Sequence, residues 1–312
     1  MIFATQNWFL LALVAPCLWA LVAIIDTYTV HSVYEDEYDG AVISGVFQSL
    51  PWILVPLGIV QFTFPGIEIA VVALLAGGFF LLSFFCYFKA LFVSNDSTLM
   101  EIIWNLNILV VPFFAWLLIG EVLVSAHYTG IAVAFLGIIL FNFDRQTKEI
   151  GYYKILLPML GAVVSMSLGM VISKQAYELS SDFWSVFLLF SIGATIATFL
   201  ILAIGRRNPF LKAKKIASLS RKYFLLFIIA EGFSVIATLT SQRAISIAPA
   251  VSVVAVIESL APVFVMIFSL ILVTVFRNSG RIDLRSYHNQ FSNAGIKMLA
   301  LSLISVGIYL IS

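Results

Sequence analysis

Charged residues are scarce in this sequence. Of its 312 residues, 11% are Asp, Glu, Lys or Arg, whereas 62% are hydrophobic and the mean hydropathy is +1.08. One soluble core cannot bury that many apolar side chains, and so few polar ones cannot cover its outside. The composition therefore excludes a water-soluble domain. The net charge of +1 does not indicate nucleic-acid binding, because the basic residues gather between apolar runs.

Cysteine and hydrolase motifs are scarce or missing as well. Cys17 and Cys86 both lie inside apolar segments. Two such residues exclude an extracellular disulfide framework and have no metal-site spacing, so we expect no metal and no other cofactor. The sequence contains neither Gly-x-Ser-x-Gly nor His-Glu-x-x-His. Because no Lys or Arg precedes the first apolar run, which is long enough to span, we expect no cleaved signal peptide.

Long apolar runs dominate the chain instead. A membrane-spanning helix needs about 20 mostly apolar residues, and ten runs of roughly that length stand between polar breaks. The sequence therefore predicts an all-α polytopic membrane protein with ten transmembrane helices, and a basic loop over 206–222. The approximate ranges of the runs are 8–27, 41–62, 67–92, 98–119, 125–143, 153–177, 183–204, 223–245, 250–276 and 294–312.

The second half of the chain echoes the first. Lys89 aligns with Arg243 and Trp104 with Glu258, at an offset of 154 residues, and the order of helix ends, cation and apolar run agrees. We expect two repeats, 1–146 and 147–312, with a polar insertion at 277–293 in the second. A unit with five crossings inserts its copy upside down, and such inverted repeats build carriers whose substrate site lies near the midplane.

A family resemblance rests on short motifs. The segment Leu117–Val124, with Gly120-Glu121 at its corner, the following Gly137-Ile138-Ile139-Leu140, Trp19-Ala20, and Leu260–Val263 resemble EamA-type carriers of the drug/metabolite transporter superfamily. The resemblance implies export of amino acids, drugs or other small metabolites across the bacterial inner membrane. The second half departs from the pattern, because it has Phe276-Arg277-Asn278 in place of the Gly-Glu corner.

Acids within the apolar runs are the candidate proton-coupling or substrate residues. A charge at the bilayer centre costs about 2.5–3.5 kcal/mol and faces a partner or a wet cavity. Glu231 and Glu258 meet this description, and Glu258 precedes Pro262 by four residues. The alternative for both acids is an ion pair that locks helix packing. Asp26 is expected at the end of the first helix.

A mixed polar and aromatic stripe marks the fourth run. Glu101, Trp104, Asn105 and Ile108 have i, i+3, i+4, i+7 spacing, which places them on one helix face. Such a face is typical of a cavity wall for a polar-aromatic solute. The alternatives are an interfacial position for Glu101 and lipid or packing contacts for Trp104.

Lys89 and Arg243 occupy equivalent positions in the two halves. They are candidates for gating or for binding a substrate carboxylate, with snorkelling to lipid headgroups as the alternative. Asn107 points away from the Glu101 stripe and is expected to form a helix–helix hydrogen bond, while Glu121 is expected to cap its corner.

These patterns favour a secondary transporter that exports a small solute by alternating access, with protons as the candidate coupling ion. Its partners would be the solute and membrane lipid, with no nucleic acid. An intramembrane enzyme and a non-transporting scaffold or lipid flippase accessory are the alternatives.

All Lys and Arg except Lys174 and Arg243 border the loops after the odd-numbered runs. The positive-inside rule therefore predicts both termini outside, whereas similar carriers are commonly drawn with both inside.

Overall fold

A computed structural model describes residues 7–93, 100, 103–141, 152–276 and 294–311. Its regular elements within these ranges are helices and include no strand, as the all-α prediction requires. In chain order they are α1 Trp8–Ser32, α2 Glu37–Phe47, the 3₁₀ helix η1 Leu50–Leu54, α3 Ile67–Val93, α5 Asn107–Ile119, α6 Ser125–Phe141, α7 Tyr152–Leu179, α8 Phe183–Gly205, α9 Pro209–Lys222, α10 Phe224–Ile247, α11 Val251–Glu258, α12 Ala261–Phe276 and α14 Ala294–Ile311.

Six helical segments of the described chain are long and apolar enough to cross a membrane. They belong to α1, α3, α7, α8, α10 and the stretch 251–271, which joins α11 to α12. Shorter apolar helices are α5, α6 and the 298–311 part of α14. By length and composition this set is compatible with an integral membrane protein.

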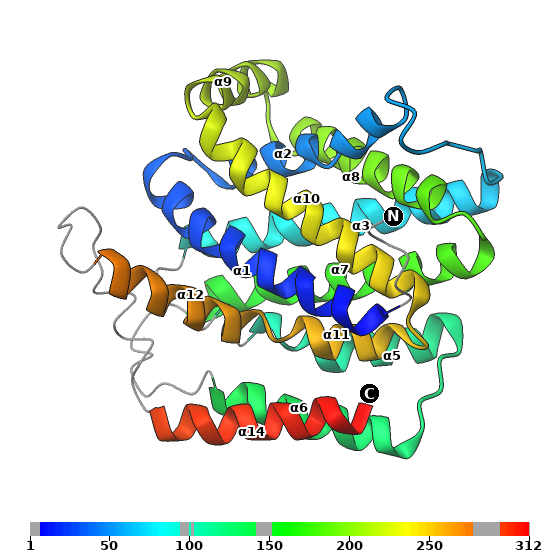
Figure 1. Cartoon of the computed structure of the whole chain (residues 1–312). Helices are drawn as coiled ribbons and strands as arrows, with labels where there is room; N and C mark the ends of the chain where they lie inside the picture. The colour runs from blue at the N-terminus through cyan, green and yellow to red at the C-terminus, as the bar shows by residue number, and fades with distance from the viewer. Residues whose placement is uncertain (1–6, 94–99, 101–102, 142–151, 277–293, 312) are drawn as a thin grey trace.

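The helices form a bundle of interleaved pairs (Figure 1). α1 packs along α10, and α3 packs along both α7 and α8. α6 and α14 pack along each other at the lower edge of the view in Figure 1. Each of these pairs therefore joins a helix of the first sequence half to a helix of the second.

Close approach of α3 to α8 depends on small residues. A Cβ built on Gly77 would lie 1.9 Å from the carbonyl oxygen of Phe190. The sequence predicts close helix contact at Gly77-Gly78, and the structure confirms it for Gly77. Gly78 instead has room, since a Cβ there would have Ala197 as its nearest neighbour at 3.9 Å.

The second apolar run, 41–62, is not one continuous helix, contrary to the sequence prediction of a transmembrane helix there. α2 ends at Phe47, η1 follows, and the chain then runs through turns to Gly66. Pro51 and Pro56 lack the amide hydrogen that would continue an α-helix. The backbone instead forms 3₁₀-type hydrogen bonds between residues three apart. The Trp52 amide, for example, donates to the Ser49 carbonyl over 3.1 Å.

The basic stretch 206–222 was predicted to be a loop, but it contains the helix α9. Pro209 stands at the first helical position, where its missing amide hydrogen costs nothing. Lys212 and Ile216, four residues apart, form the buried face of this amphipathic helix. α9 packs against α2 and α10.

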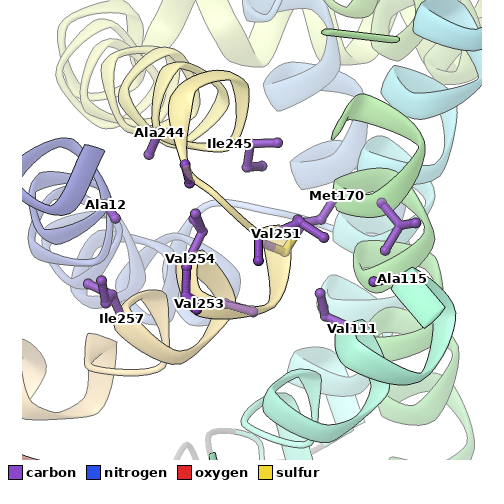
Figure 2. Packing of buried hydrophobic residues seen from close by; sticks show 14 of the residues in the cluster. Ala12, Val111, Ala115, Met170, Ala244, Ile245, Val251, Val253, Val254 and Ile257 are labelled. Atoms are coloured by element: carbon purple, nitrogen blue, oxygen red, sulfur yellow. The ribbon is translucent and has the colours of Figure 1, made fainter. Parts of the chain in front are cut away.

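The hydrophobic core centres on α11, which lies among α1, α5 and α10 (Figure 2). Val251, Val253, Val254 and Ile257 of this short helix are fully buried. Glu121, after α5, caps its start, because the carboxylate accepts the Val251 amide at 2.8 Å and also binds the amide and hydroxyl of the next residue. Capping by Glu121 is therefore observed at the start of α11 and not at its own corner, where the sequence predicts it, and it joins the two halves of the chain.

Candidate functional site

A central cavity of about 100 Å³ lies inside the bundle. Helices of both sequence halves contribute to its wall: α1, α2, α3 and α5 from the first half, together with Met100, Trp104 and Asn105, and α7, α10, α11 and α12 from the second. Its polar and aromatic lining includes Trp19, Asp26, Tyr87, Trp104, Asn105 and Glu258.

Two helices break beside this cavity, 154 positions apart. One turn is Asn105–Leu106, before α5, and the other is Ser259–Leu260, between α11 and α12. In each turn the leucine amide donates to the carbonyl three residues earlier, over 3.0 Å and 3.1 Å respectively. In each, the leucine carbonyl also accepts the amide three residues later over 2.9 Å. The matched turns interrupt the regular α-helical bonding at the cavity wall.

Glu258 is the last residue of α11 and lines the cavity. Its side chain lies near Ser241 of α10, and its Oε1 is buried with no hydrogen-bond partner among the described residues. Pro262, four residues later, has no amide hydrogen to offer the Glu258 carbonyl. The acid therefore combines a partly unsatisfied carboxylate with a freed backbone acceptor at one point of the wall.

Trp104 and Asn105 reach the same cavity from the other break. Asn105 is 2% exposed, and neither its amide nitrogen nor its amide oxygen has a hydrogen-bond partner within the described part of the chain. The ring of Trp104 meets Tyr87 of α3 edge to face, with 5.8 Å between ring centres. The structure thus brings together Trp104, Asn105 and Glu258, which the sequence analysis selected separately. Glu101, the remaining member of the predicted stripe, lies outside the described residues.

Glu231 stands one step behind the cavity wall. Its carboxylate, 2% exposed on α10, accepts a hydrogen bond from the Ser44 hydroxyl over 2.8 Å, and its Oε2 has no hydrogen-bond partner in the described ranges. Ser44, on α2, lines the cavity, whereas Glu231 is not among the lining residues. No ion pair of Glu231 or Glu258 with Arg243 is present among the described residues.

The two predicted gating cations lie away from the cavity lining. Lys89 is exposed on α3. Arg243 is half-buried, with its guanidinium 4.9 Å from the ring centre of Phe183. Lys174 donates to the Ala248 carbonyl over 2.8 Å. None of the three supplies a positive charge to the described cavity wall.

Asp26 lines the cavity, a position that the sequence analysis missed. It was expected at a helix end, but α1 continues to Ser32 and buries it. Trp19, Val22, Ala23 and Asp26 all line the cavity at i, i+3, i+4, i+7 spacing. The same periodicity that selected the Glu101 stripe was therefore present in the first run.

Asn107 has two roles. Its side-chain oxygen accepts the Ser167 hydroxyl over 2.8 Å, which is the helix–helix hydrogen bond expected from the sequence. It also lines the cavity.

The described residues include no group of three His, Cys, Asp or Glu that could hold a metal ion, and Cys17 and Cys86 form no disulfide.

An aromatic cluster meets the cavity at Phe88. Tyr34, just beyond α1, stacks on Phe227 with 5.7 Å between ring centres and meets Phe88, a cavity residue, edge to face at 6.0 Å. Burial raises the pKa of Tyr34 well above its usual value, and the nearby negative charges of Asp26 and Glu231 raise it further. Tyr34 is therefore a neutral hydroxyl next to two buried acids.

The chain shares its fold with a solved protein. No family model matches it, and no curated protein matches it. A solved structure described only as "Crystal structure of protein" is 17% identical, with a TM-score of 0.63, over 97% of this chain and 96% of that chain. At this identity the likeness shows a common fold and carries no function.

Proposed function

We propose that this chain is a secondary carrier that exports a small metabolite across the bacterial inner membrane by alternating access. The observation that carries the proposal is the central cavity, whose wall is built from both halves and flanked by a helix break from each. Interrupted helices at corresponding positions of two repeats are the best structural pointer to a transporter binding site.

The proposal includes ten crossings arranged as two inverted repeats, 1–146 and 147–312. At the offset of 154 residues α3 corresponds to α10 and the α5 region to α11 and α12, so α1 corresponds to α7. The observed packing supports this assignment, because α1 packs on α10 just as α7 packs on α3. In this scheme α2 and η1 together form the second crossing, because α2 by itself is too short to span a membrane.

Alternating access requires the two halves to move around a fixed site. Buried carboxylates supply a site for a coupling proton, because an unpaired negative charge in such a place is costly. Glu258 on the wall and Glu231 behind it are the residues we assign to this step. The half-satisfied carboxylate of each supports the assignment.

The test is transport by purified protein in proteoliposomes. A thermal-shift screen of metabolites first identifies a stabilising solute, and counterflow of that labelled solute then measures exchange. We expect Glu258→Gln to fold and insert normally but to lose counterflow, since the amide keeps the shape and removes the charge and proton. Glu231→Gln should behave in the same way.

The contradicting results are specific. Full activity with unchanged pH dependence in both single variants and in the double variant would remove carboxylate coupling. An absence of counterflow for every stabilising solute, together with peptide cleavage by the same preparation, would favour an intramembrane enzyme.

A further inference from the structure

The central cavity has an acidic wall with no compensating base. Asp26 and Glu258 are its charged residues, and no Lys, Arg or His occurs among the lining residues that the structure describes. Lys174 is engaged by the Ala248 carbonyl, and the guanidinium of Arg243 stacks on an aromatic ring. A solute carboxylate entering this cavity would meet two acids and no base, which disfavours anions and zwitterions.

Unpartnered polar atoms at the wall define what a ligand must offer. Oε1 of Glu258 is a hydrogen-bond acceptor that receives no hydrogen bond from the residues that the structure describes. The side-chain amide of Asn105 also lacks a partner among those residues, on both its nitrogen and its oxygen, and Glu258 and Asn105 are each more than nine-tenths buried. Buried polar groups are normally satisfied, so these exceptions indicate a missing partner. A group with several N–H donors suits the two free oxygens, as an ammonium does and a quaternary nitrogen does not.

Aromatic rings complete the cavity. Five rings line it, from α1, α3 and the helical residue just before the Asn105–Leu106 turn: Trp19, Phe84, Tyr87, Phe88 and Trp104. The faces of such rings attract cations, most strongly when water is excluded. They also provide the apolar surface on which a hydrocarbon or aromatic body packs.

We propose that the cavity binds a protonated primary amine with an apolar or aromatic body and no carboxylate. Its ammonium group bonds to Glu258 and to the side-chain oxygen of Asn105, while its body lies among the rings. As a statement about the transported solute this rests on the proposed carrier function, and it narrows that function from metabolites in general to amines. The binding itself does not depend on transport.

The first experiment compares three probes with one phenyl body. Phenethylamine carries an ammonium, phenylalanine an ammonium and a carboxylate, and hydrocinnamate a carboxylate. Isothermal titration calorimetry on the full chain in detergent should show phenethylamine binding at least roughly tenfold more tightly than phenylalanine, and no saturable binding of hydrocinnamate. Equal or tighter binding of either carboxylate probe, or no saturable phenethylamine binding at millimolar concentration, overturns the proposal.

Variants then locate the ammonium site. Glu258→Gln should weaken phenethylamine binding by about tenfold or more, whereas Glu68→Gln, an exposed acid at the start of α3, should leave it unchanged. Trp104→Leu should weaken it roughly fivefold, with the exposed Trp116→Leu as its control. If Glu258→Gln does not fold, the Trp104 pair decides: equal affinity in both tryptophan variants contradicts the site.

Counterflow separates this inference from the carrier function. Phenethylamine binding without counterflow of any solute would leave the amine site standing and remove the transport function. Counterflow of another solute without phenethylamine binding would support the transport function and remove the amine site. Counterflow of labelled phenethylamine that unlabelled phenethylamine drives and phenylalanine does not supports both.

Discussion

The ammonium nitrogen of Lys212 lies 2.5 Å from Oδ1 of Asp39 and ties α9 to the first turn of α2. Asp39 is 2% exposed, and its other oxygen accepts the Glu35 amide over 2.7 Å. Asp36 lies 3.1 Å from the same ammonium group and also binds Arg206. A buried charge pair therefore holds the amphipathic helix α9 against the bundle.

Lys212→Met should destabilise the protein, because it leaves the Asp39 carboxylate buried without its cation. Removing one partner of a buried pair costs about 3–5 kcal/mol, and we expect about 2–3 kcal/mol here because Lys212 keeps some exposure. The measurement is the thermal midpoint in detergent. The control is Lys215→Met, whose 3.7 Å contact with Glu35 joins two exposed side chains and should contribute less than about 1 kcal/mol. Equal shifts in both variants would show that the buried pair contributes nothing special.

The same pair predicts an alkaline loss of stability. Burial acts to lower the pKa of Lys212, but hydrogen bonds and the charges of Asp39 and Asp36 outweigh it and raise the pKa above its ordinary 10.5. A raised folded-state pKa means that the full contribution is present below pH 10.5 and is lost as the pH rises through the higher folded value. The difference in thermal midpoint between the wild type and Lys212→Met should therefore stay constant to about pH 10 and shrink above it. A difference that grows with alkalinity contradicts this sign.

Gly77 and Gly78 provide a matched pair of substitutions. Gly77→Ala places a methyl group 1.9 Å from a backbone oxygen of α8, which no rotamer change relieves, so we expect about 1–3 kcal/mol of destabilisation. Gly78→Ala meets only Ala197 at 3.9 Å and should be neutral or stabilising by up to about 1 kcal/mol, since alanine favours helix. Thermal midpoints of the two variants measure the contrast. Similar midpoints would mean that α3 and α8 separate more readily than their packing indicates.

Hydropathy predicts the fold best where one uninterrupted apolar run forms one helix. The predicted runs 67–92 and 183–204 correspond closely to α3 and α8. The prediction of one helix over 41–62 was wrong because the prolines of this run affect the backbone more than its hydropathy does. The helix α9 was missed because a basic segment of mixed polarity resembles a loop in the sequence, whereas in the structure a buried ion pair holds it against the bundle. That pair joins positions far apart in the sequence, where no local pattern reports it.

The sequence predicted some residues of the candidate site, and others could be found only from the packing of the helices. Trp104, Asn105 and Glu258 were accessible from helical spacing and from the repeat offset, and the structure places all three on one cavity. The proximity of Asp26 to Glu231 follows from the packing of α1 on α10, which the sequence does not specify. Lys89 and Arg243 match in the repeat alignment, but alignment does not state which way a side chain points.

The distribution of basic residues predicts how the protein sits in the membrane. The basic segment 206–222, with α9, lies where α8 ends and α10 begins, at the upper left of Figure 1. Positive loops are enriched on the cytoplasmic side, while acids such as Glu35 and Asp36 count for little. We therefore expect α9 in the cytoplasm, with the start of α1 and the end of α14 outside.

Fusions to the C-terminus test this orientation. Alkaline phosphatase is active only outside the cytoplasm, and a fluorescent protein exported through the general secretory route stays dark, so the prediction is an active phosphatase fusion and a dark fluorescent one. The matched control inserts the same reporters between Arg207 and Asn208, just before α9, where the pattern should invert. A bright C-terminal fusion without phosphatase activity would place both termini inside. The charge bias would then be misleading, and the orientation commonly drawn for similar carriers would hold.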